Sequence, residues 1–251
     1  MGKMTALLLQ RFKPDYMLVA FDHGEKTLRH EELASYKANR KPTPSDLIQQ
    51  LSLVQELLTN LGIKCLSMPG IEADDLIATA AIAAKELGHE VDIVSSDRDL
   101  LQLVQSQITV HLPQKGVSEL LAVTETNFAD AYLPILPSQV ADLKGIMGDS
   151  SDNLEGVKGI GEKGAVRLLQ KYGSLEAILA SLDQLSLAEQ MKFSAAVESA
   201  LLCKRLGTLD KKVVMPLTPG ELALGVCNES NLRAFLERYE LRSLSASLLK
   251  P

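Results

Sequence analysis

Acidic side chains gather where a strand pattern ends or a helix pattern begins, and this placement strongly constrains how the chain can fold. The clusters are Asp22, Glu72-Ala-Asp74-Asp75, Asp97-Arg-Asp99, Asp149 and Asp152-Asn153. Like charges held close together repel and raise one another's pKa. A fold that gathers carboxylates usually neutralises them with divalent cations, and hard oxygen ligands suit Mg²⁺ or Mn²⁺. The clusters therefore predict metal-assisted phosphoester chemistry.

Each cluster also has a purely structural interpretation. Asp97 fits a plain helix N-cap, because Ser96 and Asp99 complete a capping-box pattern. The acids at 72–75 suit the positive end of a helix dipole, and those at 149–152 suit a loop. Recurrence favours the metal interpretation. Acids follow several successive strand patterns, and the carboxyl edge of the strands is where open α/β sheets place their sites.

Strand and helix patterns alternate in the first half of the chain. The run at 16–21 (Tyr-Met-Leu-Val-Ala-Phe) is continuously apolar, which is typical of a buried parallel strand. Further strands are expected at 64–67, 90–95 and 108–112, and helices at 4–12, 45–61, 72–87 and 97–104. Such alternation predicts an α/β fold with a mostly parallel sheet.

The pattern changes near residue 123. Helices are expected at 124–132, 138–147, 162–172, 174–180 and 187–206, with a single edge strand at 212–215. We therefore predict an α/β domain at 1–123 and an all-α domain at 124–251.

A glycine-rich segment between two predicted helices forms the sharpest local motif. It reads Gly156-Val-Lys158-Gly159-Ile-Gly161-Glu-Lys163-Gly164-Ala165, with Arg167 just beyond. Gly-Ile-Gly permits a tight turn and close approach of a nucleic-acid backbone. The next helix begins near Glu162, so its free N–H groups favour a phosphate, and Lys158, Lys163 and Arg167 add positive charge. The alternative is an ordinary glycine-containing helix end.

Composition sets further bounds. Removing the eight clustered carboxylates from a net charge of -6 leaves +2, so the surface outside the clusters suits phosphate contact in places. The chain has no tryptophan, which disfavours base stacking as the main binding mode. Its three cysteines have no metal-site spacing and predict a reduced, cytoplasmic protein. No apolar run reaches membrane-spanning length.

Taken in order, the motifs resemble a known family. They are Phe21-Asp22, Tyr36-Lys37-Ala-Asn-Arg40, Glu72-Ala-Asp74-Asp75, Ser96-Asp97-Arg-Asp99-Leu100, and Gly148-Asp149-Ser-Ser-Asp152-Asn153 through Gly161. Together they resemble the 5′-nuclease (flap endonuclease) family, and above all the 5′→3′ exonuclease domain of bacterial DNA polymerase I and its stand-alone relatives. The resemblance implies a PIN-like nuclease core followed by a helix-hairpin-helix domain.

The resemblance also implies a role for each motif. Asp22, Glu72, Asp74 and Asp75 would serve a first Mg²⁺ or Mn²⁺ ion, Asp149 and Asp152 would hold a second, and Asp97 and Asp99 would lie between them. Lys37 and Arg40 would engage the scissile phosphate. Lys158, Gly159, Gly161, Lys163, Gly164 and Arg167 would grip duplex DNA, with a monovalent cation such as K⁺ at the hairpin. The implied protein is a monomer of the bacterial nucleoid that cuts DNA at 5′ flaps, nicks or RNA primers beside a DNA polymerase.

One departure separates this sequence from the family pattern. Members normally begin with a central strand that ends in Asp-Gly and supplies a ligand to the first metal, and this segment is not seen here. A sheet without that strand is expected to show a gap. Two alternatives therefore stay open beside the nuclease: a catalytically impaired DNA-binding remnant and a metal phosphohydrolase acting on small molecules. Metal-dependent cleavage of a 5′-flap substrate separates the first alternative from the nuclease, and the duplex-gripping hairpin argues against the second.

Overall fold

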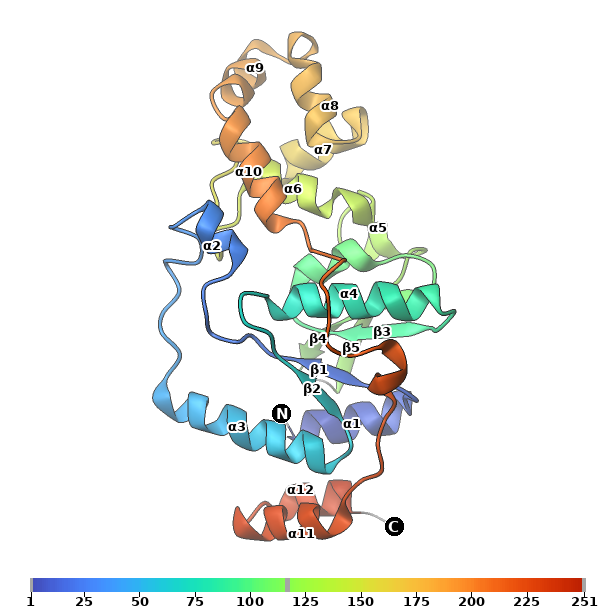
Figure 1. Ribbon diagram of the computed structural model, residues 1–251. Coiled ribbons are helices and arrows are strands. Elements are labelled where there is room, and N and C mark those ends of the chain that lie inside the picture. Colours follow the sequence, from blue (N-terminus) through green and yellow to red (C-terminus); the bar gives the residue numbers. More distant parts are fainter. Residues whose placement is uncertain (1, 116–117, 250–251) are drawn as a thin grey trace.

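Within the residues that the structure describes, the α/β part of the protein contains five strands, with helices packed around them (Figure 1). The computed structural model describes residues 2–115 and 118–249. The elements of this part are α1 (Gly2–Phe12), β1 (Leu18–Ala20), α2 (Leu28–Glu32), α3 (Ser45–Asn60), β2 (Lys64–Leu66), α4 (Ala73–Glu86), β3 (Val91–Val94), the 3₁₀ helix η1 (Arg98–Leu103), β4 (Ile108–Lys115) and β5 (Glu119–Val123).

Pairing among the strands is mostly parallel, as the sequence predicts. β1 pairs with β2 in parallel, with Val19 opposite Cys65, and β3 pairs with β4 in parallel. β5 is an unexpected antiparallel partner of β4. Its sequence, Glu-Leu-Leu-Ala-Val, has weak intrinsic strand preference, so its pairing with β4 decides its conformation. Within the described residues the strands form two separate sheets, one of β1 and β2 and one of β3, β4 and β5.

Helices make up the second part, as predicted. They are α5 (Phe128–Ala131), η2 (Pro137–Gln139), α6 (Val140–Met147), α7 (Glu162–Tyr172), α8 (Leu175–Ala180), η3 (Leu182–Gln184), α9 (Leu187–Ser194), α10 (Val197–Gly207), η4 (Pro219–Leu222), α11 (Glu229–Arg238) and α12 (Arg242–Leu248). Among the described residues, none of these or the earlier helices is both long and apolar enough to cross a membrane.

Three predicted elements differ from the structure. The helix expected at 124–132 shortens to α5, because the Asn127 side chain bonds to Thr124 N and forms a turn first. The helix expected at 187–206 breaks at Ala195 and Ala196 into α9 and α10, two residues after the fully buried Phe193. The segment 212–215 is not a strand, since the backbone N–H of Val213 donates to Thr79 Oγ1 instead of to a neighbouring strand.

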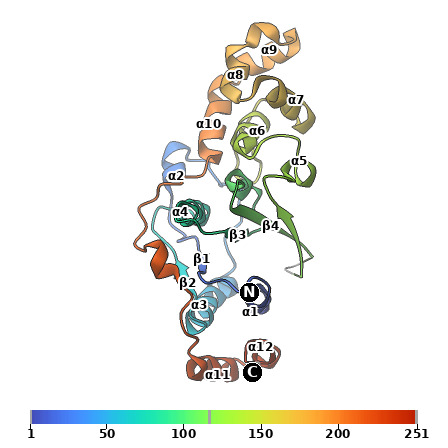
Figure 2. The same cartoon turned by 90° about the vertical axis from the view of Figure 1, so that its right-hand side faces the viewer.

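Two large apolar cores hold the molecule together. The first joins β3, β4 and η1 to α6, α7 and α8, with Leu100, Leu101 and Leu168 fully buried. The second packs α3 against α11 through Leu58 and Leu232. α4 lies on one side of the β1–β2 pair, and α1 and α3 lie on the other (Figures 1 and 2).

The chain returns to the α/β part after α10. The backbone N–H of Leu224 donates to the carbonyl of Asp15, and α11 and α12 then pack beside α3 and α1 at the end of the molecule opposite α9 (Figure 1). The domain boundary near residue 123 stays a prediction, and the end residues of the predicted domains, Met1 and Pro251, lie outside the described residues.

Candidate metal centre

Three of the predicted acids lie close enough together in the described part of the chain to hold a metal ion. Asp99, Asp149 and Asp152 each place one oxygen within 4.8 Å of the others. Asp99 lies in η1, whereas Asp149 and Asp152 lie in the loop that follows α6. Paired backbone hydrogen bonds of 2.9 and 2.8 Å between Asp149 and Leu154 close that loop, so both acids face η1 from a fixed turn.

Asp149 is held by donors on both carboxylate oxygens. Oδ1 accepts from the backbone N–H of Ser151 at 2.8 Å and from its hydroxyl at 2.6 Å. Oδ2 lies 2.5 Å from the ammonium of Lys144 on α6. Burial alone would raise the pKa of Asp149, but these hydrogen bonds lower it to about 2.

The same lysine also bonds to Asp99. Nevertheless, burial raises the pKa of Asp99 to about 6, with the charges of Asp97 and Asp149 adding to the rise and Lys144 opposing it. The two acids differ because Asp149 also has the Ser151 donors. Buried carboxylates that repel one another are stabilised by added positive charge, which a divalent ion supplies.

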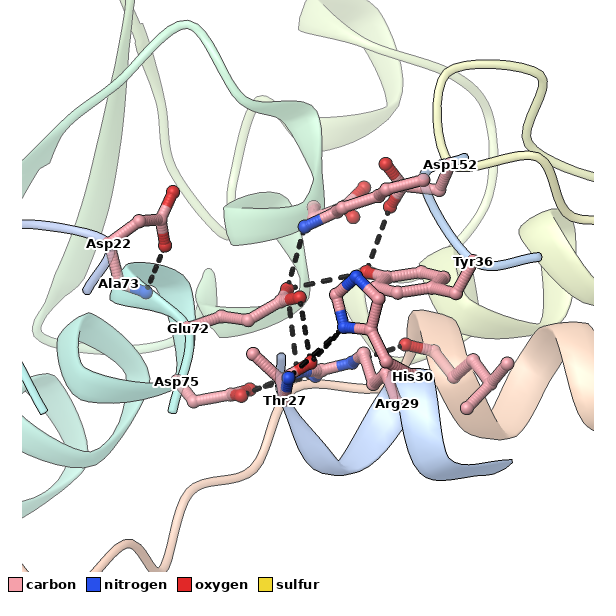
Figure 3. Close-up of polar contacts among 12 residues, drawn as sticks. Asp22, Thr27, Arg29, His30, Tyr36, Glu72, Ala73, Asp75 and Asp152 are labelled. Carbon is pink, nitrogen blue, oxygen red and sulfur yellow. Dashed lines mark hydrogen bonds and ion pairs between the residues drawn. The ribbon is translucent and has the colours of Figure 1, made fainter. Parts of the chain in front are cut away.

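Glu72, at the N-cap of α4, anchors the other half of the centre. It is 7% exposed and accepts from Lys37 Nζ at 2.9 Å. It also accepts from the Tyr36 hydroxyl at 3.3 Å (Figure 3). The same hydroxyl lies 3.2 Å from Asp152. Tyr36 therefore links Glu72 to the three-acid cluster.

Asp74, Asp22 and Asp97 complete the group electrostatically. Burial, followed by the charges of Asp97, Asp99 and Asp22, raises the pKa of Asp74 to about 7. Asp22 Oδ1 accepts from the first N–H of α4, that of Ala73, and Asp97 accepts from Asp99 N as the N-cap of η1. The capping role considered for Asp97 is therefore present. We use the term acidic centre for Asp22, Glu72, Asp74, Asp97, Asp99, Asp149 and Asp152.

Asp75 has other partners, although it neighbours Asp74. Its two oxygens accept from Arg29 of α2 at 2.6 and 2.9 Å (Figure 3). Its Oδ1 also accepts from the backbone N–H of Asp210. Arg29 donates in addition to the carbonyl of Leu206 on α10. These partners tie three helices together and contact both oxygens of Asp75. Arg29 also lies 3.5 Å from Glu72, so Asp75 adjoins the centre through this arginine, and its role as a ligand stays a prediction.

The two side chains predicted to bind phosphate, Lys37 and Arg40, form ion pairs with acids of the centre. Lys37 is bound to Glu72, and Arg40 lies 2.5 Å from Asp152. The backbone N–H of Lys37, a residue with φ of 54°, also donates to the carbonyl of Asp152. We call residues 33–41 the arch segment; it is closed onto the loop that carries Asp152. A cavity of 450 Å³ lies beside this contact, and its lining includes Arg40, Asp97, Asp99, Tyr132, Lys144, Asp149 and Asp152.

The glycine hairpin begins α7 as predicted, at Glu162. Gly159 has φ of 81°, and its carbonyl accepts from Lys192 of α9 at 2.9 Å. Gly161, by contrast, is extended, with φ of -92°, so only Gly159 of this Gly-Ile-Gly turn needs a glycine for its backbone conformation. Lys158 and Lys163 are exposed, whereas Arg167 is paired with Glu189.

The sequence matches a known protein family over most of its length. Residues 1–132 match the family described as 5′-3′ exonuclease, N-terminal resolvase-like domain, and residues 135–230 match its C-terminal SAM fold. The chain belongs to the 5′-3′ exonuclease family. A 5′-3′ exonuclease of Mycoplasma pneumoniae is 37% identical over 95% of this chain and 82% of its own length. DNA polymerase I of Bacillus caldotenax is 38% identical over 94% of this chain, which spans only 28% of that protein's length.

Solved structures share the 5′-3′ exonuclease fold. The bacteriophage T5 flap endonuclease, solved with DNA and metal ions, superposes with a TM-score of 0.69 at 21% identity over 95% of this chain and 89% of its own. The catalytic core of Rad2 with DNA substrate gives 0.65 at 18% identity over 99% and 84%. Identities this low support the fold alone.

Three residues of this exonuclease-family centre have no predicted role in the sequence. Lys144, Tyr36 and Arg29 each contact two or more of the acids. A signal existed for Lys144, because it interrupts the apolar helix Val-Ala-Asp-Leu-Lys-Gly-Ile-Met, and a buried lysine needs a carboxylate partner. No comparable pattern marks Arg29, since its partners lie far away along the chain.

Proposed function

We propose that this chain is a structure-specific 5′→3′ exonuclease and flap endonuclease that hydrolyses phosphodiesters of DNA or of RNA primers. The observation that carries the proposal is the acidic centre itself, in which Asp99, Asp149 and Asp152 lie within 4.8 Å of one another beside the arch cations. The Mycoplasma pneumoniae relative is a 5′-3′ exonuclease, and the T5 relative is a flap endonuclease bound to DNA and metal ions.

The donor set fits two Mg²⁺ or Mn²⁺ ions. All its side-chain ligands are carboxylate oxygens, which hard divalent cations prefer. Asp99, Asp149 and Asp152 would hold one ion, and Asp22, Glu72 and Asp74 the other, with Asp97 between them. When bound, such ions supply an activated water and charge stabilisation for the leaving oxygen. A T5 exonuclease structure carries divalent zinc, which supports an ion site in this fold.

Lys37 and Arg40 would act on the scissile phosphate. In the structure they neutralise Glu72 and Asp152, and bound cations would replace them there. The two side chains would then be free to approach a phosphate at the centre. Positive groups placed where negative charge develops stabilise the transition state more than the bound substrate.

The hairpin would hold the duplex beside the centre. Lys158, Lys163 and the N–H groups at the start of α7 suit backbone phosphates, with Arg167 exchanging Glu189 for a phosphate. Gly164 and Gly161 leave room for that approach, and a monovalent cation such as K⁺ would assist it. The enzyme would act as a monomer on 5′ flaps, nicks or primers in the bacterial nucleoid, alongside a DNA polymerase.

Cleavage of a labelled 5′-flap duplex tests the proposal. We expect cleavage with Mg²⁺ or Mn²⁺ and none in EDTA. Asp97→Asn should remove most activity and leave duplex binding intact, because asparagine keeps the N-cap of η1 while losing the charge. Full activity of Asp97→Asn, or activity in EDTA, would contradict a two-ion nuclease. Duplex binding without any cleavage by the unchanged chain would favour the non-catalytic alternative.

A further inference from the structure

Lys144 places a positive charge inside the acidic centre. Its ammonium lies 2.5 Å from Asp149 Oδ2 and bonds at the same time to Asp99 Oδ2. The three side chains are only 13–16% exposed, so water screens these contacts poorly. Lys144 comes from the middle of α6, the helix that precedes the Asp149 loop, and its position is therefore fixed by a packed element.

The carboxylates that bind Lys144 belong to the cluster that would bind an ion. Asp149 Oδ1 is taken by Ser151 N and Oγ, which leaves Oδ2 as the oxygen for a cation, and Oδ2 contacts Lys144. Asp99 likewise presents Oδ2 to the lysine. An ammonium ion and a divalent ion cannot use the same lone pairs at full strength, so they compete.

We infer that Lys144 is a positioning residue that substitutes for the divalent ion in the metal-free protein. It holds Asp99 and Asp149 at the spacing of metal ligands, and it gives up at least part of these contacts when an ion binds. Lys144 therefore weakens ion binding at this cluster while it stabilises the metal-free fold. The inference rests on the proposed function only in taking Asp99, Asp149 and Asp152 as an ion site.

Removing the charge should have two effects of opposite sign. Lys144→Met keeps the length and the apolar stem of the side chain but loses the ammonium. Without it, Asp99 and Asp149 repel each other, so the metal-free protein should unfold at a lower temperature. An incoming ion should meet a more negative site, so its affinity should rise at least about tenfold. If Lys144 had a purely structural role, its replacement would lower both the unfolding temperature and the affinity for the ion.

Lys204 provides a matched control. This lysine of α10 also lies between two carboxylates, at 2.6 Å from Asp142 and 2.6 Å from Glu176, and its side chain is 23% exposed. Neither carboxylate belongs to the acidic centre. Lys204→Met should therefore lower the stability of the metal-free protein and leave ion affinity at the wild-type value.

The experiment is a Mn²⁺ titration of the metal-stripped protein without DNA. Calorimetry gives the affinities, electron paramagnetic resonance of free Mn²⁺ gives the number of bound ions, and the unfolding temperature is measured in EDTA. The variants are Lys144→Met, Lys144→Gln and Lys204→Met. Each Lys144 variant is also made with Asp149→Asn, which disables the cluster; the gain in affinity should vanish in that background.

Unchanged or weaker Mn²⁺ binding by Lys144→Met would overturn the inference. If Lys144→Met does not fold, Lys144→Gln decides, because its amide keeps hydrogen bonds to the acids without the charge. A gain in affinity that persists with Asp149→Asn also overturns it, since the effect would then arise elsewhere. If the wild-type protein binds Mn²⁺ but cleaves no flap, the proposed function alone is contradicted. If it binds no Mn²⁺, both the proposed function and the inference about Lys144 are contradicted.

Discussion

At the scale of single residues, the cations of the arch segment have partners before any substrate arrives. Lys37 and Arg40 neutralise Glu72 and Asp152, and Tyr36 lies between those two acids. Lys37 and Arg40 would pair with carboxylates in the metal-free protein and with a phosphate of the substrate in the complex with DNA. Such a double use makes their contribution to binding small, since one set of contacts is exchanged for another.

Lys37→Ala should therefore slow cleavage far more than it weakens binding. We expect a loss of about a hundredfold or more in the single-turnover rate, because the charge would act mainly in the transition state. Lys41→Ala removes an exposed charge of the same segment and should change the rate little. An equal loss of affinity with an unchanged rate would make Lys37 a docking residue.

At the hairpin, Gly159 and Gly161 should respond differently to substitution. Gly159→Ala puts a side chain at φ of 81° and should cost about 1 kcal/mol of stability, whereas Gly161→Ala has ordinary φ and open space around its Cβ. Gly161→Val should weaken duplex binding, because the branched side chain blocks the backbone of the duplex. Thermal unfolding of Gly159→Ala and Gly161→Ala, together with a duplex-binding assay on Gly161→Val, checks these expectations. Equal stability losses would show that the turn conformation does not depend on Gly159.

The lysines beside this turn should contribute non-specific charge. We expect Lys158→Ala and Lys163→Ala each to reduce the slope of log K against log salt by about one unit. Each should also weaken the binding of all duplexes to a similar extent. The measurement is a salt titration on two duplexes of unrelated sequence. A loss on one sequence only would argue against a phosphate clamp.

At the scale of elements, Arg29 ties α2 to α4 and α10. It binds both oxygens of Asp75 and the carbonyls of Leu206 and Thr208, and its side chain is 14% exposed. Because α2 leads into the arch segment, this tie also fixes one end of the arch. The contact supplies the buried Asp75 carboxylate with a partner of opposite charge.

Arg29→Met should cost about 3–5 kcal/mol of stability, because it leaves the buried Asp75 carboxylate without its main partner. The control joins the same two helices, α2 and α10, through the exposed pair Glu32 and Arg205. Arg205→Ala should cost less than about 1 kcal/mol. Urea unfolding of both variants checks the difference, and similar losses would show that burial of the Arg29 pair carries no extra stability.

At the scale of the whole molecule, stability and pH are linked through the acidic centre. The pKa of Asp74 is raised to about 7 and that of Asp99 to about 6, from an ordinary value of 3.8. An acid whose pKa is higher in the folded state binds its proton more tightly there. Its contribution to stability is therefore complete below pH 3.8 and is lost as pH rises through 6 and 7.

The metal-free protein should accordingly lose part of its stability between pH 5 and pH 8. Thermal unfolding in EDTA at several pH values measures the loss, and Mg²⁺ or Mn²⁺ should reverse it by neutralising the ionised acids. Asp74→Asn should flatten the profile, because asparagine does not titrate. If the stability of the metal-free protein instead rises steadily from pH 5 to pH 8, the ionisation of Asp74 and Asp99 does not destabilise the fold.

Much of the architecture follows from local patterns. The apolar run before Asp22, the helix at Ser45–Asn60 and the start of α7 at Glu162 depend on neighbours in the chain, and all three agree with the sequence-based prediction. β5 and the break between α9 and α10 were not predicted. β5 has a sequence of weak strand preference, and its pairing with β4, the strand directly before it in the chain, decides its conformation. The break lies at Ala195 and Ala196, residues that favour a helix and so give no local signal for it.

The sequence by itself determined that acids stand at the ends of strands and that a glycine turn precedes a helix, because both depend on residues a few positions apart. Only the tertiary structure decided which acids share the centre. Asp74 and Asp75 are adjacent, yet successive residues of a helix point about 100° apart, so one faces Asp99 and the other Arg29. The contact of Lys144 with Asp99 was decided in the same way, since the packing of α6 against η1 brings together two charges that lie 45 residues apart in the chain.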